Sequence, residues 1–97
     1  MCFEWDEAKN RQNLAKHKTS FETAVLVFDD PHALSYQDRL VDGEERWQTF
    51  GMINGIVLMV AYIFWEEEDG EDVIRIISAR RVNAHERNIY EAHKKSG

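Results

Sequence analysis

The chain of 97 residues carries 12 Lys and Arg against 18 Asp and Glu, has a hydrophobic content of 43%, and contains one Cys and one Pro. One core fits this length, the lone Cys excludes a disulfide framework or a cysteine-based metal site, and the longest apolar run, 56–65, is too short for a membrane helix. Since a secretory signal pattern is also missing, we expect residues 1–97 to form one cytoplasmic domain without membrane association.

The N-terminal third predicts two helices. Residues 3–5 alternate and could form a short strand, after which Asp6 is placed to cap a helix over 7–16 that begins with acids and ends with bases. Ser20 is a second N-cap, and apolar residues at i, i+3, i+4 and i+7 from Phe21 predict an amphipathic helix that ends before Pro31.

From His32 onward the apolar period changes to two, which predicts strands. Asp42-Gly43 signals a turn, and Asn54-Gly55 predicts a tight hairpin because both residues tolerate the positive φ of a type I′ turn. Six acidic residues in 66–72 predict a solvated turn with no catalytic role. The predicted strands are 33–37, 46–53, 56–65 and 73–79.

Asn83 followed by Glu86 is typical of a capping box and predicts a last helix to about Lys94. The elements together predict an α+β fold with two N-terminal helices, a four-stranded antiparallel β-meander and a C-terminal helix.

Arginines supply the first candidate functional residues. Strict alternation places Arg75 and Arg80 on opposite faces of the last strand, so they cannot share a site unless a bulge or the strand end re-aims one of them. Our interpretation is that Arg75 makes a structural ion pair and Arg80 faces a ligand, because a desolvated arginine needs an anionic partner. Arg46 remains open between a surface pair and a phosphate contact.

Three other residues have both a structural and a catalytic interpretation. His17, beside Lys16, either caps the carbonyls of the first helix or transfers a proton near neutral pH. Glu86 is the capping-box carboxylate or a catalytic group, and Tyr90, on the same helix face, packs in the core with its hydroxyl at the surface or assists catalysis. The tryptophans are assigned to packing rather than base stacking, and no histidine spacing predicts a metal site.

Several runs occur in collinear order over nearly the whole chain and carry a further signal. They are F-E-W-D-E-A-K (3–9), 13–17, S-F-E-T-A (20–24), V-F-D-D-P (27–31), Glu45-Arg46, Gly51, R-I-I-S-A-R-R (75–81), Glu86-Arg87 and Tyr90. In this combination the chain resembles the BrnT family of toxins. The resemblance implies a RelE-like fold and a ribonuclease toxin of a type II toxin-antitoxin pair, which cuts RNA and halts translation and growth.

The resemblance also implies a metal-independent reaction without cofactors, in which a base deprotonates the ribose 2′-hydroxyl for attack on the adjacent phosphorus. On that scheme His17 is the general base or acid, Arg46 and Arg80 hold the phosphate and the transition state, and Glu86 or Tyr90 assists. The expected RNA-binding residues are Lys16, Arg75 and Arg81.

The implied partner is a BrnA-like antitoxin whose ribbon-helix-helix part binds operator DNA, so that the hetero-oligomer represses its own operon. One alternative is a catalytically inactive BrnT-like module that binds only the antitoxin, and another is an adaptor that joins an oligomer through an apolar helix face.

Two features depart from the family pattern. Lys18 stands where a Gly would end the first helix, which predicts a left-handed residue or a different connection, and the acidic turn would repel RNA if it faced the substrate.

Overall fold

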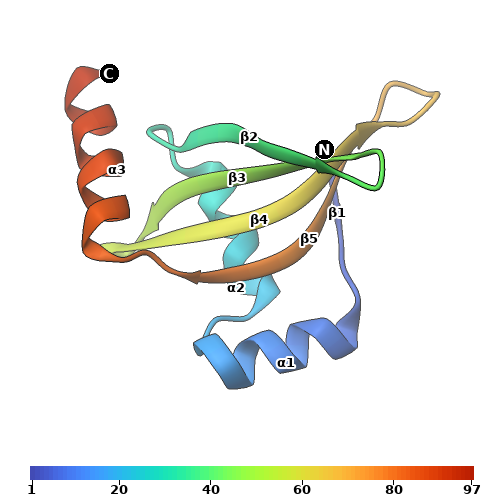
Figure 1. Cartoon of the computed structure of the whole chain (residues 1–97), viewed down its shortest axis with the longest axis horizontal. Helices are drawn as coiled ribbons and strands as arrows, with labels where there is room; N and C mark the ends of the chain where they lie inside the picture. The colour runs from blue at the N-terminus through green and yellow to red at the C-terminus, as the bar shows by residue number, and fades with distance from the viewer.

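The computed structural model describes the backbone of residues 1–97 and the side chains of 1–39 and 42–97. It confirms the α+β class, with a mixed sheet of five strands in the order β1-β5-β4-β3-β2 and three α-helices (Figure 1). The strands are β1 (Cys2–Glu4), β2 (Leu34–Val41), β3 (Glu44–Ile53), β4 (Ile56–Glu66) and β5 (Asp72–Arg81). The helices are α1 (Glu7–His17), α2 (Phe21–Ala24), the 3₁₀ helix η1 (Val25–Asp29) and α3 (Ala84–Ser96).

The predicted meander is present as β2 to β5, but the prediction of a wholly antiparallel sheet of four strands was wrong. β1 pairs in parallel with β5, from Cys2 opposite Val73 to Glu4 opposite Arg75. The alternation of residues 3–5 indicated a strand. It could not indicate that β5 is the partner strand, because β5 begins about 70 residues further along the sequence.

The prediction of two N-terminal helices is also only partly right. Asp6 caps α1 and accepts hydrogen bonds from the N–H groups of Ala8 and Lys9, and Lys18 adopts the expected left-handed conformation, with φ 58°. The second helix, in contrast, changes from α to 3₁₀ geometry after Ala24. Tighter 3₁₀ winding is common at the C-terminus of an α-helix, and β-branched Val25 favours the α form less than Ala does.

The hairpin turns are as predicted. Asp42 and Asn54 have φ values of 52° and 49°, and the glycine that follows each of them also has a positive φ. The Asn83–Glu86 capping box at the start of α3 is present in both directions, with Oδ1 of Asn83 accepting from the Glu86 N–H and Oε1 of Glu86 accepting from the Asn83 N–H.

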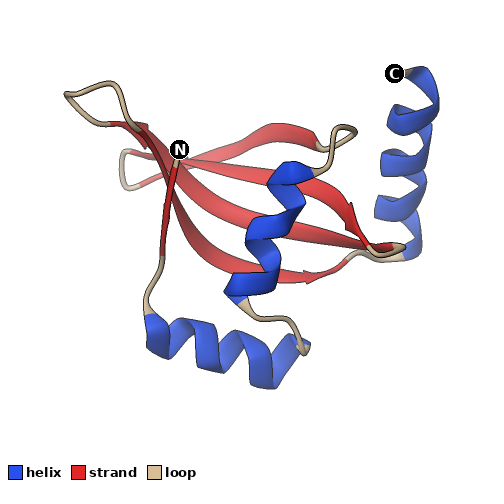
Figure 2. Ribbon diagram, turned by 180° about the vertical axis from the view of Figure 1, so that it is seen from behind, coloured by secondary structure: helices blue, strands red, loops and turns tan.

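The helices cover the sheet unequally. α2 and η1 lie behind the sheet in Figure 1 and in front of it in Figure 2, whereas the other face is left open except at one end, where α3 stands. The main core lies between α2, η1 and the covered face and includes Phe21, Val27 and Val60. A second cluster on the open face packs Tyr90 of α3 against Phe50, Val57 and Met59. None of the described helices is long and apolar enough to cross a membrane.

Candidate active site

A β-bulge in β5 determines which arginines share a face. Ala61 of β4 pairs with Ser78, but its neighbour Tyr62 pairs with Ile76, so Ile77 is an extra residue in β5. An extra residue reverses the alternation of the side chains that follow it. Arg75 and Arg80 therefore both point to the open face, and the opposite placement expected from strict alternation does not occur.

Asn13 of α1 holds this irregular part of β5. Its side-chain N–H donates to the carbonyl oxygens of Ala79 (2.7 Å) and Thr19 (2.8 Å), while its Oδ1 accepts from the Ala79 N–H (3.2 Å). The buried amide thus pairs with β5 as a neighbouring strand would, directly after the bulge. Nothing in the residue spacing of β5 indicated this contact.

The arginines form a strip across the open face. Arg46 of β3 and Arg75 of β5 are both paired with Ile63 of β4, and one end of the strip continues to Arg80, which is paired with Met59. Neighbouring strands lie about 4.8 Å apart, so the Cα atoms of Arg46 and Arg75 are roughly 10 Å from each other. We call Arg46, Arg75 and Arg80 the arginine strip.

Arg75 and Arg80 are both already paired with carboxylates, so the assignment of an ion pair to Arg75 alone was incomplete. Arg75 Nη1 lies 2.6 Å from Glu4 Oε2. The two terminal nitrogens of Arg80 donate to the two oxygens of Glu86 at 2.8 and 2.9 Å. This bidentate contact raises the pKa of Arg80 and is the main reason why the pKa of Glu86 is lowered.

Arg46 differs from the other two members of the strip. It makes no ion pair with any described side chain, and its buried Nε has no hydrogen-bond partner among the described residues. A buried donor without a partner is costly. Since no described carboxylate pairs with its guanidinium, Arg46 is the member of the strip that an added anion could bind without displacing an ion pair.

Tyr90 lies in the core, but its hydroxyl does not lie at the surface. The side chain is fully buried, and the hydroxyl donates to Asp30 Oδ2 at 2.5 Å. Burial, together with this hydrogen bond, raises the pKa of Tyr90. Asp30 also accepts from the N–H groups of Met52 and His32. Burial raises the pKa of Asp30, but the hydrogen bond from Tyr90 and these two bonds together outweigh burial, so that the pKa is lowered. Asp30 was not among the expected site residues, because the sequence before Pro31 indicated only the end of a helix.

Lys16 and His17 of α1 lie beside β5, next to the arginine strip. They line a groove of about 260 Å³ between α1 and β5, together with Asn13 and the bulge residues Ile77 and Ser78. His17 is half-buried there. Arg81, in contrast, follows Arg80 and therefore points to the helix-covered side of the sheet, where it lines a groove with Lys18.

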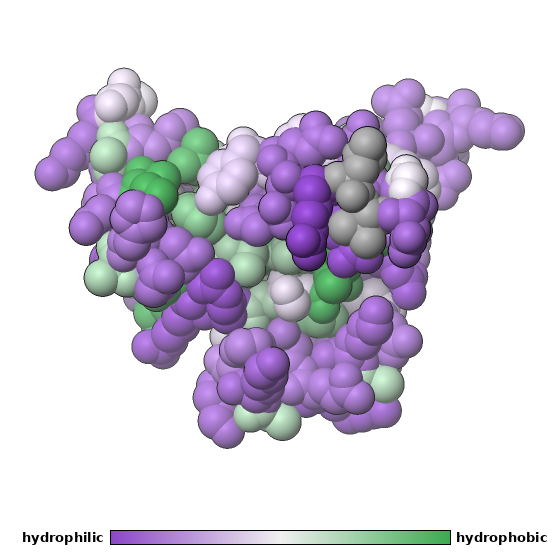
Figure 3. Space-filling model, in the orientation of Figure 1, coloured by the Kyte–Doolittle hydropathy of each residue, from purple (hydrophilic) through white to green (hydrophobic). Residues whose placement is uncertain are grey.

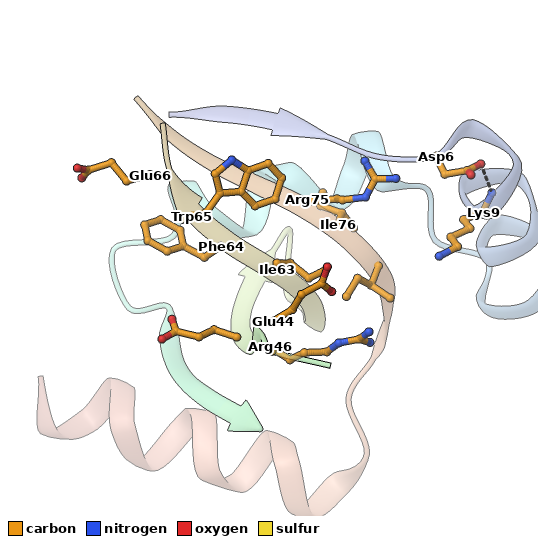
Figure 4. Close-up of a pocket in the computed structure, with 13 residues that line it drawn as sticks. Asp6, Lys9, Glu44, Arg46, Ile63, Phe64, Trp65, Glu66, Arg75 and Ile76 are labelled. Carbon is orange, nitrogen blue, oxygen red and sulfur yellow. Dashed lines mark hydrogen bonds between the residues drawn. The ribbon is translucent and has the colours of Figure 1, made fainter. Parts of the chain in front are cut away.

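A larger cleft of about 820 Å³ lies at the end of the open face away from α3 (Figure 4). It contains Arg46 and Arg75 together with Lys9, which also lines the His17 groove. Figure 3 shows apolar side chains in the middle of the open face, surrounded by hydrophilic ones. Among the described residues, no three His, Cys, Asp or Glu side chains are placed to hold a metal ion.

A basic strip on an open sheet face, with a histidine groove beside it, defines a small α+β domain suited to bind a polyanion. The family model of the ribonuclease toxin BrnT of type II toxin-antitoxin systems matches residues 5–86, which include His17 and the whole arginine strip. The chain therefore belongs to the BrnT family of type II toxin-antitoxin ribonuclease toxins, and such a system implies a protein antitoxin as partner. No curated protein matches the chain.

Proposed function

We propose that this chain is a metal-independent endoribonuclease with a RelE-like fold that inhibits translation and growth. The observation that carries the proposal is the bulge at Ile77, because it turns Arg80 to the open face that already carries Arg46 and Arg75, next to the His17 groove. Positive groups on a concave, half-buried surface attract RNA phosphates and stabilise the charge that develops during phosphoryl transfer.

In the proposed reaction, the ribose 2′-hydroxyl loses its proton to a base and attacks the adjacent phosphorus. The bond from phosphorus to the 5′-oxygen breaks, and this oxygen receives a proton, which leaves a 2′,3′-cyclic phosphate and a 5′-hydroxyl. His17 is the proposed base or acid because a histidine can do both near neutral pH. Arg46 and Arg80 are the proposed phosphate and transition-state contacts, and Lys16 and Arg75 bind the RNA backbone.

The remaining expected site residues, Glu86, Tyr90 and Arg81, do not contact the reacting phosphate in the proposed reaction. Glu86 acts through Arg80, which it orients by accepting hydrogen bonds from both terminal nitrogens of the guanidinium. Tyr90 assists by fixing α3 to the sheet through Asp30. Arg81 is on the other side of β5, so RNA that contacts it would extend beyond the arginine strip.

The proposed partner is a BrnA-like ribbon-helix-helix antitoxin that covers the arginine strip with an acidic or amphipathic segment, since blocking the phosphate contacts stops cleavage. The hetero-oligomer would contact operator DNA only through the antitoxin and repress the operon. We propose that both proteins act in the cytoplasm.

One observation favours a second function, that of an inactive module which binds only the antitoxin. Arg75 and Arg80 already have carboxylate partners, Glu4 and Glu86, which compete with an RNA phosphate. Arg46 alone would then meet an incoming phosphate without an existing ion pair to a described side chain.

Cleavage of labelled single-stranded RNA in the presence of a metal chelator tests the proposal. The wild type should produce 2′,3′-cyclic phosphate ends, and replacing His17, Arg46 or Arg80 with Ala should each slow cleavage by about 10²- to 10³-fold. Arg87→Ala, which removes an exposed arginine of α3, is the matched control and should cleave at the wild-type rate. The proposal fails if all three site variants fold and cleave as fast as the wild type.

A further inference from the structure

The large cleft beside the arginine strip has features that phosphate binding does not explain. Besides Arg46 and Arg75, an indole ring and carboxylates surround it (Figure 4). Carboxylates repel a phosphate, but they accept hydrogen bonds from the donor groups of a base. The following inference rests on the proposed function and concerns what this cleft recognises.

Trp65 occupies the side of β4 that faces the cleft. It is two residues from Ile63, so it lies on the same side of the sheet as Arg46 and Arg75, about 6.7 Å further along the strand. Its indole Nε1 donates to Glu67 Oε1 at 3.0 Å, which holds the ring in one orientation. A half-exposed aromatic ring next to cationic side chains is a platform on which an RNA base can stack.

Glu44 is the carboxylate on the same side of the sheet. It lies two residues before Arg46 in β3, is exposed, and makes no ion pair with any described side chain. Its neighbour Glu45 points to the opposite side of β3 by alternation. The last antiparallel pair at this end of β3 and β4 is Arg46 with Ile63, and continuing the same register brings Glu44 toward Trp65; both residues line the cleft.

We propose that the cleft is a nucleotide subsite that recognises a guanine next to the phosphate bound by Arg46 and Arg75. The base stacks on Trp65, and its N1–H and exocyclic N–H donate to the two oxygens of Glu44. Guanine is the only RNA base that presents two neighbouring donors to one carboxylate. Adenine, cytosine and uracil each place an acceptor beside their donor, and this acceptor would face a carboxylate oxygen.

Binding of two pentaribonucleotides, UUGUU and UUAUU, to the full chain tests this subsite. Both oligomers carry 2′-O-methyl groups, which prevent cleavage. Calorimetry measures the affinity of the chain for each oligomer. The wild type should bind the guanine oligomer about 5- to 150-fold more tightly, the range for one good bidentate contact. Glu44→Gln should abolish this preference, whereas the control Glu68→Gln, in the exposed turn after β4 and outside the cleft lining, should retain it.

The stacking contact needs a separate pair of variants. Trp65→Ala should weaken both oligomers by about 5- to 150-fold, and Trp65→Phe should largely restore binding because it keeps an aromatic face. Equal affinity of the wild type for the two oligomers, or an unchanged preference in Glu44→Gln, overturns the subsite. If longer RNA is then still cleaved at the wild-type rate without base preference, the proposed function stands; if no RNA is bound or cleaved, the function fails as well.

Discussion

Two short hydrogen-bonded contacts hold α3 on the sheet, and each depends on a single carboxylate. Asp30 accepts a hydrogen bond from the Tyr90 hydroxyl, near the middle of α3. Glu86, near the start of α3, accepts a hydrogen bond from Arg80 of β5. Only Tyr90 of α3 is buried. We therefore expect single substitutions at these contacts to affect stability and the position of Arg80 more than other changes on this helix.

Tyr90→Phe should lower the free energy of unfolding by about 1–3 kcal/mol. The phenyl ring preserves the packing against Phe50 and Met59, but the Asp30 carboxylate loses its shortest hydrogen bond in a partly buried place. Chemical denaturation followed by circular dichroism measures the change. Tyr36→Phe is the control, because the Tyr36 hydroxyl has no hydrogen-bond partner among the described residues, and an equal loss in both variants would contradict the account.

Glu86 should make stability depend on acid pH. Its folded-state pKa is lowered from the ordinary value of 4.5, chiefly by the hydrogen bonds from Arg80. The contribution is therefore complete above the ordinary pKa and is lost as the pH falls from about 4.5 through the lower folded pKa. Thermal unfolding of Glu86→Gln across this range should show a flatter pH dependence than the wild type, and identical slopes would disprove the contribution.

At the scale of elements, α1 and β5 depend on each other. The bulge at Ile77 sets the direction of Arg80, and Asn13 of α1 bonds the backbone of β5 at Ala79, two residues further on. Helix and strand are thus joined by a side chain that satisfies an otherwise unpaired strand edge. The same contact keeps the His17 groove beside the strip.

Asn13→Ala should destabilise the fold by about 3 kcal/mol, because buried backbone groups at Ala79 and Thr19 lose their partners at about 1–3 kcal/mol each. It should also slow RNA cleavage at temperatures where the protein remains folded, since the bulge and Arg80 lose their support. Val27→Ala, a core truncation in η1 where the side chain packs against Gly51 of β3, is the matched control for stability alone. Equal cleavage rates in the two folded variants would show that Asn13 does not position the strip.

Local signals predicted most of the elements. The caps Asp6, Ser20 and Asn83 and the Asn54-Gly55 turn act through neighbouring residues, so the chain shows them directly. The parallel pairing of β1 and the bulge of β5 could not be predicted in this way. Both depend on contacts between segments more than 60 residues apart, such as Asn13 with Ala79.

The candidate site was predictable as a set of residue types but not as an arrangement. The arginines and His17 were found from their chemistry, whereas the pairing of Arg80 with Glu86 and the role of Asp30 required the fold. Capping predicted one contact of Glu86, and only the three-dimensional position of β5 revealed the second.

At the scale of the whole molecule, a net charge of −6 is compatible with a basic functional face. The acidic turn between β4 and β5 projects at the end of the sheet away from α3 (Figure 1). Arg80 lies near α3 and Arg46 and Arg75 lie between these ends. The charge is therefore polarised along the sheet, and under the proposed function this polarity would orient a bound RNA strand.

Growth after tight induction of the chain in a bacterial host, with total RNA examined within minutes, tests the central claim most directly. We predict that the wild type stops growth and degrades RNA, and that Arg46→Ala, whose side chain makes no ion pair with a described residue, relieves both effects at equal soluble expression. Uninterrupted growth and intact RNA with well-expressed wild-type protein would contradict the nuclease and leave the antitoxin-binding module as its function.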